Sequence, residues 1–447
     1  MMLRILQRAA VTLSVLMAGT LSLPALAAIP IQHWTQPSGA RVYLVESPSI
    51  PMLDAQLDFD AGSRRDPAQQ AGLASVTALM AGKGVAARGA EAALDENQLG
   101  EAWADLGSAF GASADSDRMS FTLRTLTDPE LLRQSVRLAA RQLGEPSWPE
   151  DIWRRERERL SAAIKESRTR PGTVASLAFE PAVYGGHPYG FETTPESLAR
   201  IGTADMRARY AATIAPCRAK VSLVGAVTRA QADQIVTELL ARLPQGAACA
   251  PLPVVPEVAP LAAPVDERVA FESAQAHVLI GQPGYKRSDP EFFALLVGNH
   301  ILGGGGFTSR LTNQVREQRG LSYSVYSYFA PGLHAGAFTL GLQTRPDQAA
   351  EAVRVARQVV REFVADGPTE EELQAAKDNL IGGFALRLDS NRKLLGNVTN
   401  IAWNELPLDY LEHWTERVRQ VSAADIRTAF QRVLQPERMV TVVVGGR

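Results

Sequence analysis

An internal repeat constrains what this chain can fold into more than any other feature of its sequence. The tripeptide Phe-Thr-Leu at residues 121–123 recurs 217 residues later, at residues 338–340, and both copies are followed by a turn with proline and an amphipathic pattern. The pattern Ala-Asp-x-Arg at residues 204–207 recurs at residues 424–427, a spacing of 220 residues. Such a small change of spacing is an ordinary difference in loop length, so the repeat predicts two homologous halves.

Each half mixes strand and helix patterns. Ala55, Leu57 and Phe59 alternate with polar residues, which is the period of a half-buried strand. Thr369 and Glu372 form a capping-box pattern that predicts the start of a helix. Neither half shows the regular strand–helix alternation of a parallel sheet. We therefore predict an α+β fold with two homologous halves, each a mixed or antiparallel β-sheet with helices packed on one face.

A proline-rich segment separates the two copies of the repeat. Five prolines lie among small residues between positions 245 and 266, a composition that is typical of an extended, semi-rigid linker. We predict an N-terminal domain at residues 28–244, a linker at residues 245–266 and a C-terminal domain at residues 267–447.

The start of the chain has the pattern of an export signal. Arg4 and Arg8 precede an apolar run at residues 9–23, and Ala-Leu-Ala at residues 25–27 is a small-x-small cleavage pattern. We predict a signal peptide at residues 1–27 and a mature, periplasmic protein without a membrane segment. An uncleaved anchor is the alternative, although the apolar run is short for a stable span. Cleavage removes two arginines and changes the net charge from −2 to −4, which argues against a nucleic-acid partner.

Cys217 and Cys249 are the two cysteines of the chain. Export makes a disulfide between them chemically possible. Cys217 opens a predicted strand at residues 218–225, and a predicted helix at about residues 230–243 would bring the chain back toward it. The two alternatives are a disulfide between these cysteines and two separate cysteines that pack as small apolar residues.

The histidines do not form a recognisable metal site in the sequence. The two nearest, His277 and His300, lie 23 residues apart, so neither His-Glu-x-x-His nor His-x-x-Glu-His occurs. A Gly-x-Ser-x-Gly nucleophile motif is also missing. These observations argue against a self-contained metallopeptidase or serine hydrolase, and a hydrolase with unrecognised ligands is a further alternative.

A run of four glycines precedes the most informative segment of the second half. The run consists of Gly303, Gly304, Gly305 and Gly306. The Gly-Lys-Ser/Thr continuation of a phosphate-binding loop does not follow it, so nucleotide binding is not indicated. Glycines allow another chain to approach closely, and a plain flexible loop is the alternative.

Arg316 and Tyr323 follow this run, seven residues apart. The sequence between them predicts a helix that ends at Gly320, followed by a strand. A guanidinium and a phenol can both donate hydrogen bonds to a peptide carbonyl or carboxylate. On spacing alone, an ordinary solvated helix position for Arg316 is equally compatible with the pattern.

The segment at residues 303–326 resembles the second-domain signature of the pitrilysin/insulinase/mitochondrial-processing-peptidase family, Gly-Gly-x-x-Ser-Arg-Leu and then Arg-Glu-x-x-Gly-Leu-x-Tyr. The two homologous halves are similar to those of this family as well. The resemblance implies that Arg316 and Tyr323 hold the substrate backbone near the scissile bond and that the glycine run contacts substrate. His-Pro-Tyr-Gly at residues 187–190 also looks like a family motif, for which we predict a structural role.

The first half departs from the family at its zinc motif. Family members carry Gly-Leu-Ala-His-x-x-Glu-His, whereas this chain has Ser75, Ala78 and Leu79 at the positions of the first histidine, the glutamate and the second histidine. Ala162 and Ala163 precede the Ile-Lys step where the third ligand is expected. Alanine and leucine cannot bind zinc or activate water, so we predict that this chain holds no metal and is inactive alone.

Some bacterial members of the family divide the work between two proteins, and this sequence resembles the one that keeps the arginine–tyrosine pair without zinc. The resemblance implies a non-catalytic, substrate-binding subunit of a zinc-dependent endopeptidase, with a zinc-bearing family member as heterodimer partner and peptides as substrates. The alternative is a structural or peptide-binding protein of the same fold with no role in proteolysis.

Overall fold

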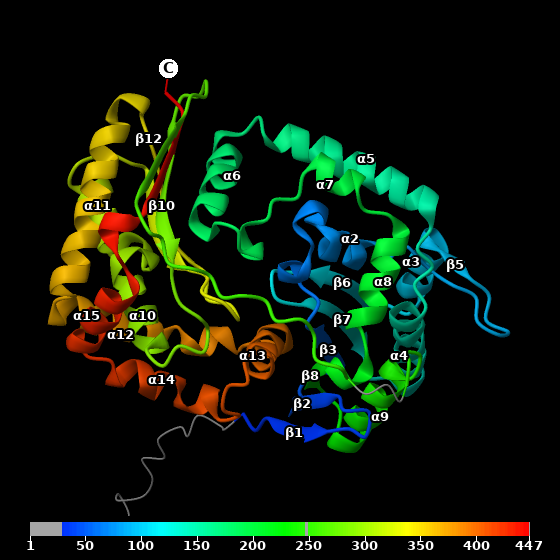
Figure 1. Ribbon diagram of the computed structural model, residues 1–447. Coiled ribbons are helices and arrows are strands. Elements are labelled where there is room, and N and C mark those ends of the chain that lie inside the picture. Colours follow the sequence, from blue (N-terminus) through cyan, green and yellow to red (C-terminus); the bar gives the residue numbers. More distant parts are fainter. Residues whose placement is uncertain (1–28, 246–248, 447) are drawn as a thin grey trace, which may run out of the picture.

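Figure 1 shows the computed structural model of the chain, in which two halves lie side by side and each is built around one β-sheet. The structure describes residues 29–245 and 249–446. The predicted signal peptide at residues 1–27 lies outside the described residues. The predicted α+β class is confirmed, because both main sheets are largely antiparallel and carry α-helices on their faces.

The first half forms one main sheet and a small two-stranded ribbon. Its elements are β1 (Gln32–Thr35), β2 (Arg41–Glu46), β3 (Met52–Phe59), α2 (Leu73–Met80), β4 (Gly84–Val85), β5 (Leu94–Asp95), α3 (Glu96–Asp105), β6 (Ala109–Ala114), β7 (Met119–Leu126), α4 (Pro129–Gly144), α5 (Glu150–Ser167), α6 (Pro171–Tyr184), α7 (Pro195–Ala199), α8 (Thr203–Thr213), β8 (Lys220–Gly225) and α9 (Arg229–Leu240). The strand order of the main sheet is β1-β2-β8-β3-β7-β6. Strands β2 and β8 are parallel, and the other neighbours are antiparallel.

The second half repeats this plan with a five-stranded sheet. Its elements are β9 (Val265–Val269), β10 (Ala276–Pro283), α10 (Phe292–Asn299), β11 (Ser324–Phe329), β12 (Ala337–Thr344), α11 (Ala349–Asp366), α12 (Glu370–Gly382), α13 (Asn391–Trp403), α14 (Tyr410–Gln420), α15 (Ala423–Val433) and β13 (Val440–Val444). The strand order is β11-β12-β10-β13-β9, and β11 is therefore an edge strand. Strands β9 and β13 are parallel, and the other neighbours are antiparallel.

The internal repeat of the sequence corresponds to repeated elements. β7 and α4 match β12 and α11, and the final strands β8 and β13 match in the same way. Phe121 and Phe338, the first residues of the repeated tripeptide, are both buried in the core of their half. The capping box predicted at Thr369 is confirmed, since its hydroxyl accepts a hydrogen bond from the Glu372 N–H at 3.2 Å where α12 begins.

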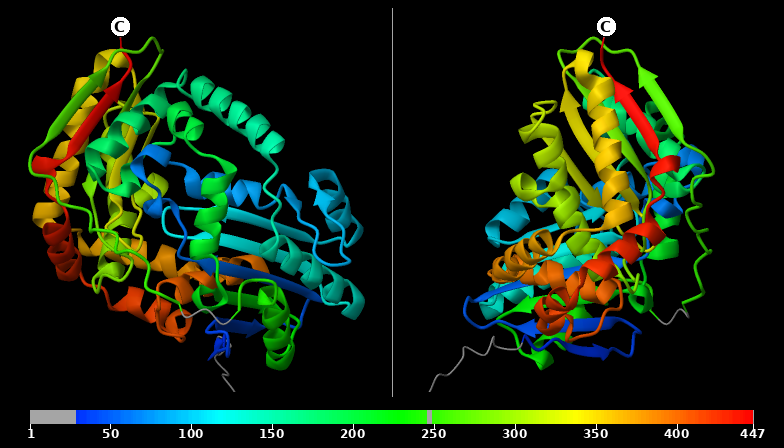
Figure 2. Two further views of the ribbon diagram at one scale, coloured as in Figure 1. Left: turned by 45° about the vertical axis from the view of Figure 1, so that its right-hand side comes forward. Right: turned by 90° about the vertical axis from the view of Figure 1, so that its left-hand side faces the viewer.

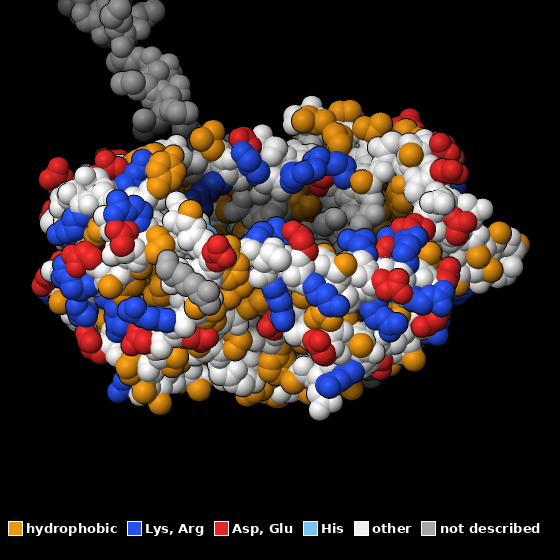
Figure 3. Space-filling view, turned by 90° about the horizontal axis from the view of Figure 1, so that it is seen from above, with side chains coloured by type: hydrophobic (Ala, Val, Ile, Leu, Met, Phe, Trp, Pro, Cys, Tyr) orange, Lys and Arg blue, Asp and Glu red, His pale blue; other side chains and the backbone are white. Residues whose placement is uncertain are grey.

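One helix of each half packs against the sheet of the other half. α6 lies against β10 and β13 of the second sheet, and α13 lies against β8 and β3 of the first (Figure 1). Ile280 of β10 packs among the second half's own helices, whereas its neighbour Leu279 packs with α6 on the opposite face. Phe179 of α6 covers Gly281, where a Cβ atom would lie 2.7 Å from the ring. Each sheet thus has helices on both faces, whereas the sequence predicted helices on one face only. The molecule is hollowed where the two halves meet (Figure 3).

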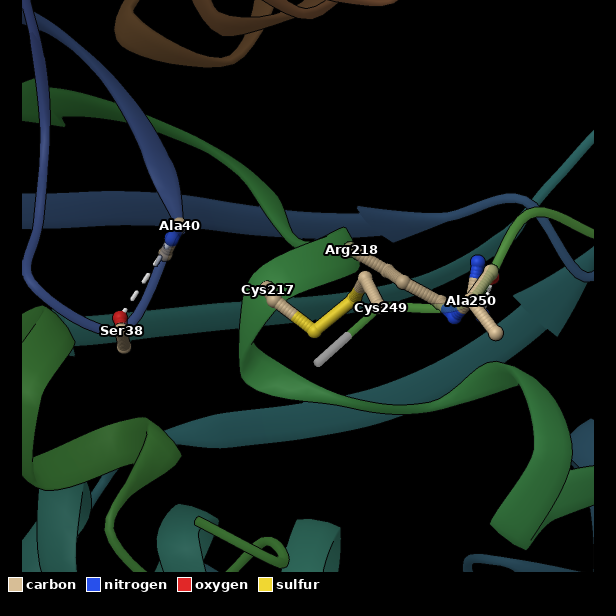
Figure 4. The surroundings of a disulfide bond; sticks show 6 residues. All are labelled: Ser38, Ala40, Cys217, Arg218, Cys249 and Ala250. Atoms are coloured by element: carbon tan, nitrogen blue, oxygen red, sulfur yellow. Dashed lines mark hydrogen bonds between the residues drawn. A yellow bond between two sulfur atoms is a disulfide. The ribbon is translucent and has the colours of Figure 1, made fainter. Parts of the chain in front are cut away.

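A disulfide joins Cys217 and Cys249, whose Cα atoms lie 6.1 Å apart (Figure 4). Cys217 lies in the short turn that precedes β8. Beside the disulfide, Arg218 donates a hydrogen bond to the Ala250 carbonyl at 2.5 Å. The start of the linker is therefore attached to the first half by a covalent bond and by a backbone contact.

The linker continues to β9 and is held on the way. β9 begins at Val265, two residues inside the predicted linker, and pairs with β13 (Figure 2). The Pro256 carbonyl lies 3.0 Å from His187 Nε2, and the Glu257 carboxylate accepts a hydrogen bond from the Ala335 N–H at 3.0 Å. The linker thus contacts both halves, and the domain boundaries otherwise remain predictions.

The His-Pro-Tyr-Gly motif at residues 187–190 lies at the junction between the halves. Tyr189 donates a hydrogen bond to Asp117 Oδ1 at 2.5 Å and accepts one from the His334 N–H at 3.2 Å. The other oxygen of Asp117 accepts a hydrogen bond from the Leu333 N–H at 2.9 Å. Burial raises the pKa of Tyr189 well above its ordinary value, so the phenol keeps the proton that it donates. These contacts give the motif a structural role.

Candidate functional site

A cleft of ≈ 690 Å³ lies in the second half, where the end of α10 meets the edge strand β11. α10 continues into a π-helical turn, η5 (His300–Gly304), and a second π-helical segment, η7 (Thr312–Glu317), precedes β11. The cleft is lined by Asn299, Gly303, Gly304, Gly306, Phe307, Thr312, Arg316, Tyr323, Ser324, Val325, Tyr326, Ser327 and Tyr328. It therefore contains most of the glycine run together with the predicted arginine–tyrosine pair.

The glycine run is packed rather than loose. A Cβ atom at Gly303 would lie 2.4 Å from Ser327 Oγ, and one at Gly304 would lie 2.8 Å from Asn299 Nδ2. Gly306 has φ +62, a left-handed conformation that glycine adopts without strain. The run lets α10 approach β11 and then turns the chain. A plain flexible loop does not describe Gly303 and Gly304, which belong to η5.

Arg316 and Tyr323 lie together in the structure. Gly320 has φ +62 and ends the helical segment between them, as a C-terminal glycine should. The guanidinium carbon of Arg316 lies 5.0 Å from the centre of the Tyr323 ring, within cation–π range. Tyr323 is 80% exposed, and Arg316 Nε lies 3.2 Å from Glu317 Oε1. Both side chains therefore present hydrogen-bond donors at the mouth of the cleft.

Phe307 completes this arrangement, and sequence reasoning missed it. The guanidinium carbon of Arg316 lies 4.9 Å from the centre of the Phe307 ring, so Arg316 contacts two aromatic rings at once. Phe307 belongs to η6 (Gly306–Thr308), the turn at the end of the glycine run. A large aromatic residue directly after four glycines is the signal that could have pointed to it. Gly305, the remaining member of the run, packs against His300 and lies outside the cleft lining.

The polar groups that line the cleft are one cation and several neutral donors and acceptors. Among the described residues that line it, Arg316 carries the only charge, and the other polar groups are amides and hydroxyls such as those of Asn299 and Thr312. A guanidinium beside neutral donors suits carbonyl oxygens and carboxylates. In this described lining there is no histidine, cysteine or carboxylate that could activate water or attack a peptide bond.

α2 contains Ser75, Ala78 and Leu79, the positions that the sequence resemblance assigns to the zinc motif. Ser75 and Leu79 lie one turn apart on the same face of α2, and Ala78 is 3% exposed. Ala162 and Ala163 are exposed on α5. A hydroxyl and aliphatic groups do not fit zinc, which takes imidazole, thiolate or carboxylate ligands. Within residues 29–245 and 249–446 there is no group of three or more His, Cys, Asp or Glu side chains that could hold a metal.

Protein contacts hold the start of α2 in place. The buried Asp66 carboxylate accepts hydrogen bonds from the Gly72 and Ala74 N–H groups, each at 3.1 Å. Arg209 lies 3.3 Å from the same carboxylate. Burial raises the pKa of Asp66 to about 6, against the opposing effects of Arg209 and the backbone donors. The helix that would carry the zinc motif is therefore anchored by this carboxyl group.

Comparisons with known proteins agree on one family. A family model described as peptidase M16 inactive domain matches residues 200–380. The crystal structure of a peptidase M16 inactive domain from Pseudomonas fluorescens is 32% identical, covers 93% of this chain and 98% of that chain, and has a TM-score of 0.87. A Helicobacter pylori protein named non-peptidase homolog YmxG is 25% identical over 387 residues, 85% of this chain and 86% of that protein. An uncharacterised zinc protease of Streptomyces coelicolor is 31% identical over 179 residues, 38% of that protein.

The duplicated α+β fold, in which the described residues of α2 include no histidine or glutamate, is that of a peptidase homologue. The chain belongs to the M16 peptidase family, that of pitrilysin and insulinase, since it is 32% identical to the Pseudomonas fluorescens inactive domain over nearly its full length. The family predicted from the sequence is thereby confirmed.

Proposed function

We propose that this chain is the non-catalytic, peptide-binding subunit of a zinc-dependent endopeptidase, and that a zinc-bearing member of the same family is its partner. One observation carries the proposal. Arg316 and Tyr323 stand together at an open cleft, whereas Ser75, Ala78 and Leu79 occupy the positions where a zinc peptidase needs its ligands and base. In this proposal the described residues of the cleft bind the peptide, and the groups that hydrolyse it belong to the partner.

The proposed division of labour follows from the chemistry of each part. The Arg316 guanidinium and the Tyr323 phenol donate hydrogen bonds to backbone carbonyls or to a carboxylate of the peptide. Gly303, Gly304 and Gly306 leave room for the peptide backbone beside them. Zinc held by the partner would supply the activation of water that hydrolysis needs. Because this chain holds the peptide in place, part of the translational and rotational entropy of the peptide is already lost before the partner's reaction begins.

We also propose that the chain works in the periplasm after loss of residues 1–27. The basic, apolar and small-residue pattern of that segment supports export, and the disulfide between Cys217 and Cys249 suits an oxidising compartment. No helix among the described residues is long and apolar enough to cross a membrane.

A second candidate is a peptide-binding or structural protein with no role in proteolysis. The lack of zinc ligands on α2 favours it as much as it favours a non-catalytic subunit. The name non-peptidase homolog, given to the Helicobacter pylori relative, is compatible with either role.

Reconstitution separates the two candidates. The mature chain, a family member with an intact zinc motif from the same genome, and their mixture are each assayed for bound zinc and for cleavage of unstructured peptides. The proposal predicts that this chain alone binds no zinc and cuts nothing, and that the mixture cuts faster than the zinc-bearing protein alone. A mixture no faster than the zinc protein would move the second candidate to first place, and cleavage by this chain alone would contradict both.

A further inference from the structure

Four large aromatic side chains gather at the cleft and are exposed. They are Phe307, Tyr323, Tyr326 and Tyr328. Soluble proteins seldom leave several large rings together on the surface unless the patch binds something. Arg316 and Tyr323 are enough to account for backbone recognition, so the remaining rings require another explanation.

The two tyrosines of β11 form a fixed aromatic surface. Tyr326 and Tyr328 lie two residues apart and therefore point to the same face of the strand. Their ring centres are 6.1 Å apart, and their planes are inclined by 17°. Tyr326 rests on Gly341 of β12, where a Cβ atom would lie 2.4 Å from the ring. Because glycine has no side chain, Gly341 leaves room for the Tyr326 ring, and the aromatic surface is already formed before a ligand binds.

The charge of the cleft narrows the choice of ligand. Arg316 is the only charged group in its described lining, and its guanidinium carbon lies 4.9 Å from the ring centre of Phe307 and 5.0 Å from that of Tyr323. Arg316 Nε lies 3.2 Å from Glu317 Oε1, so a ligand meets the remaining N–H groups of the guanidinium, which attract carboxylates and carbonyls and disfavour a cation placed against them. The lining is otherwise aromatic rings, small residues and neutral donors, which suit an apolar side chain on a polar backbone.

We propose that this cleft selects extended, neutral or acidic peptide segments that carry an aromatic side chain next to the carbonyl group held by Arg316. Phe307 and Tyr326 are the walls that receive the aromatic side chain of the peptide. Contact with Phe307 also positions the Arg316 guanidinium. The inference rests on the proposed function, because it names the class of peptide that the same cleft takes.

The test measures peptide binding to the full mature chain by fluorescence polarisation. Three short labelled peptides share a background of alanine, serine and glycine: one has a central phenylalanine, one has alanine in its place, and one adds lysines around the phenylalanine. We expect the phenylalanine peptide to bind roughly tenfold more tightly than the alanine peptide, the usual effect of filling an aromatic pocket. The lysine-flanked peptide should bind more weakly than the neutral phenylalanine peptide.

Variants locate the preference. Phe307→Ala and Tyr326→Ala should remove the phenylalanine preference while weak, Arg316-dependent binding of the alanine peptide persists. Phe307→Tyr should retain the preference, and Ile50→Ala serves as the matched control, because Ile50 is an exposed apolar residue of the first half that does not line the cleft. Thermal melting of each variant verifies that it is folded.

The outcomes distinguish this inference from the function on which it rests. Equal binding of the phenylalanine and alanine peptides, both lost in Arg316→Ala, would overturn the aromatic preference and leave the proposed function standing. Failure of every peptide to bind the wild-type chain, with and without the zinc-bearing partner, would overturn both. If Phe307→Ala and Tyr326→Ala instead abolished association with the partner while peptide preference stayed intact, the aromatic surface would be a subunit contact and the inference would be wrong.

Discussion

The guanidinium carbon of Arg316 lies 5.0 Å from the ring centre of Tyr323, although a turn separates the two residues along the chain. Arg316 lies in the last turn of the π-helical segment η7, and Tyr323 directly precedes β11. The left-handed turn at Gly320 reverses the chain between them. The pair therefore depends on how closely the end of α10 and η7 pack against β11.

That packing makes Gly303 a sensitive position. In Gly303→Ala, the new Cβ would lie 2.4 Å from Ser327 Oγ and 2.5 Å from Ser327 N, so the strand or the helix must move. We expect the free energy of unfolding to fall by about 1–3 kcal/mol, measured by urea denaturation. Gly100→Ala in α3 is the matched control, because no heavy atom of the described residues lies within 4 Å of a Cβ there. Its stability should be unchanged or slightly raised, and a similar result for Gly303→Ala would contradict the close packing.

The disulfide should contribute to stability through the chain that it closes. Cys217 and Cys249 are 32 residues apart in sequence, and a loop of that size corresponds to about 3.7 kcal/mol in the chain-entropy description. Replacing both cysteines by serine should lower the free energy of unfolding by about that amount. A reducing agent should lower the stability of the wild-type chain similarly and leave the double variant unchanged. Equal stability of the oxidised wild type and the variant would show that the bond contributes nothing.

Acid should weaken the attachment of the linker at Glu257. Burial acts to raise the pKa of this carboxyl group, but the ion pair with Lys286 and the N–H groups of Ala335 and Val258 outweigh it and lower the pKa to about 2. A lowered pKa means that the ionised group stabilises the folded chain above about pH 4.5 and that this contribution is lost as the pH falls toward 2.

Glu257→Gln tests this pH dependence. The variant should lose about 1 kcal/mol or less at pH 7, because the carboxylate is partly exposed to solvent. Its unfolding free energy should also change less than that of the wild type between pH 4.5 and pH 2. Glu437→Gln is a suitable control, since Glu437 is more exposed and lies 3.8 Å from Arg361. Parallel pH profiles of Glu257→Gln and the wild type would contradict the assigned role.

The internal repeat made the duplicated fold predictable, but the packing of α6 and α13 on the sheet of the opposite half could not be predicted from the sequence. Phe121 and Phe338 belong to strands of the same local pattern, so the matching halves follow from sequence periodicity. The apolar face of α6, with Phe179, shows that the helix must be covered, but its pattern does not say which sheet covers it. That face packs against Gly281 of β10, which lies about a hundred residues further along the chain, in the other half.

The candidate site was predictable where its geometry is local. Arg316 and Tyr323 flank a helix end marked by Gly320, so their proximity follows from short-range rules. Phe307 reaches Arg316 only because the turn after the glycine run has one specific shape, which no periodic pattern encodes. The support of Tyr326 by Gly341 depends on the pairing of β11 with β12 and was beyond sequence reasoning for the same reason.

Replacement of Arg316 in the assembled pair tests the central claim most directly. Peptide cleavage by the complex of the zinc-bearing partner with Arg316→Ala is compared with that of the wild-type complex, and Arg319→Ala is the matched control. Arg319 is a nearby arginine that bonds to the Gln314 carbonyl at 2.7 Å and lies outside the cleft lining. We expect Arg316→Ala to lower kcat/KM by roughly tenfold or more, with zinc content and complex formation unchanged, because a group that holds the peptide is lost. Wild-type kcat/KM in the Arg316→Ala complex would contradict the account.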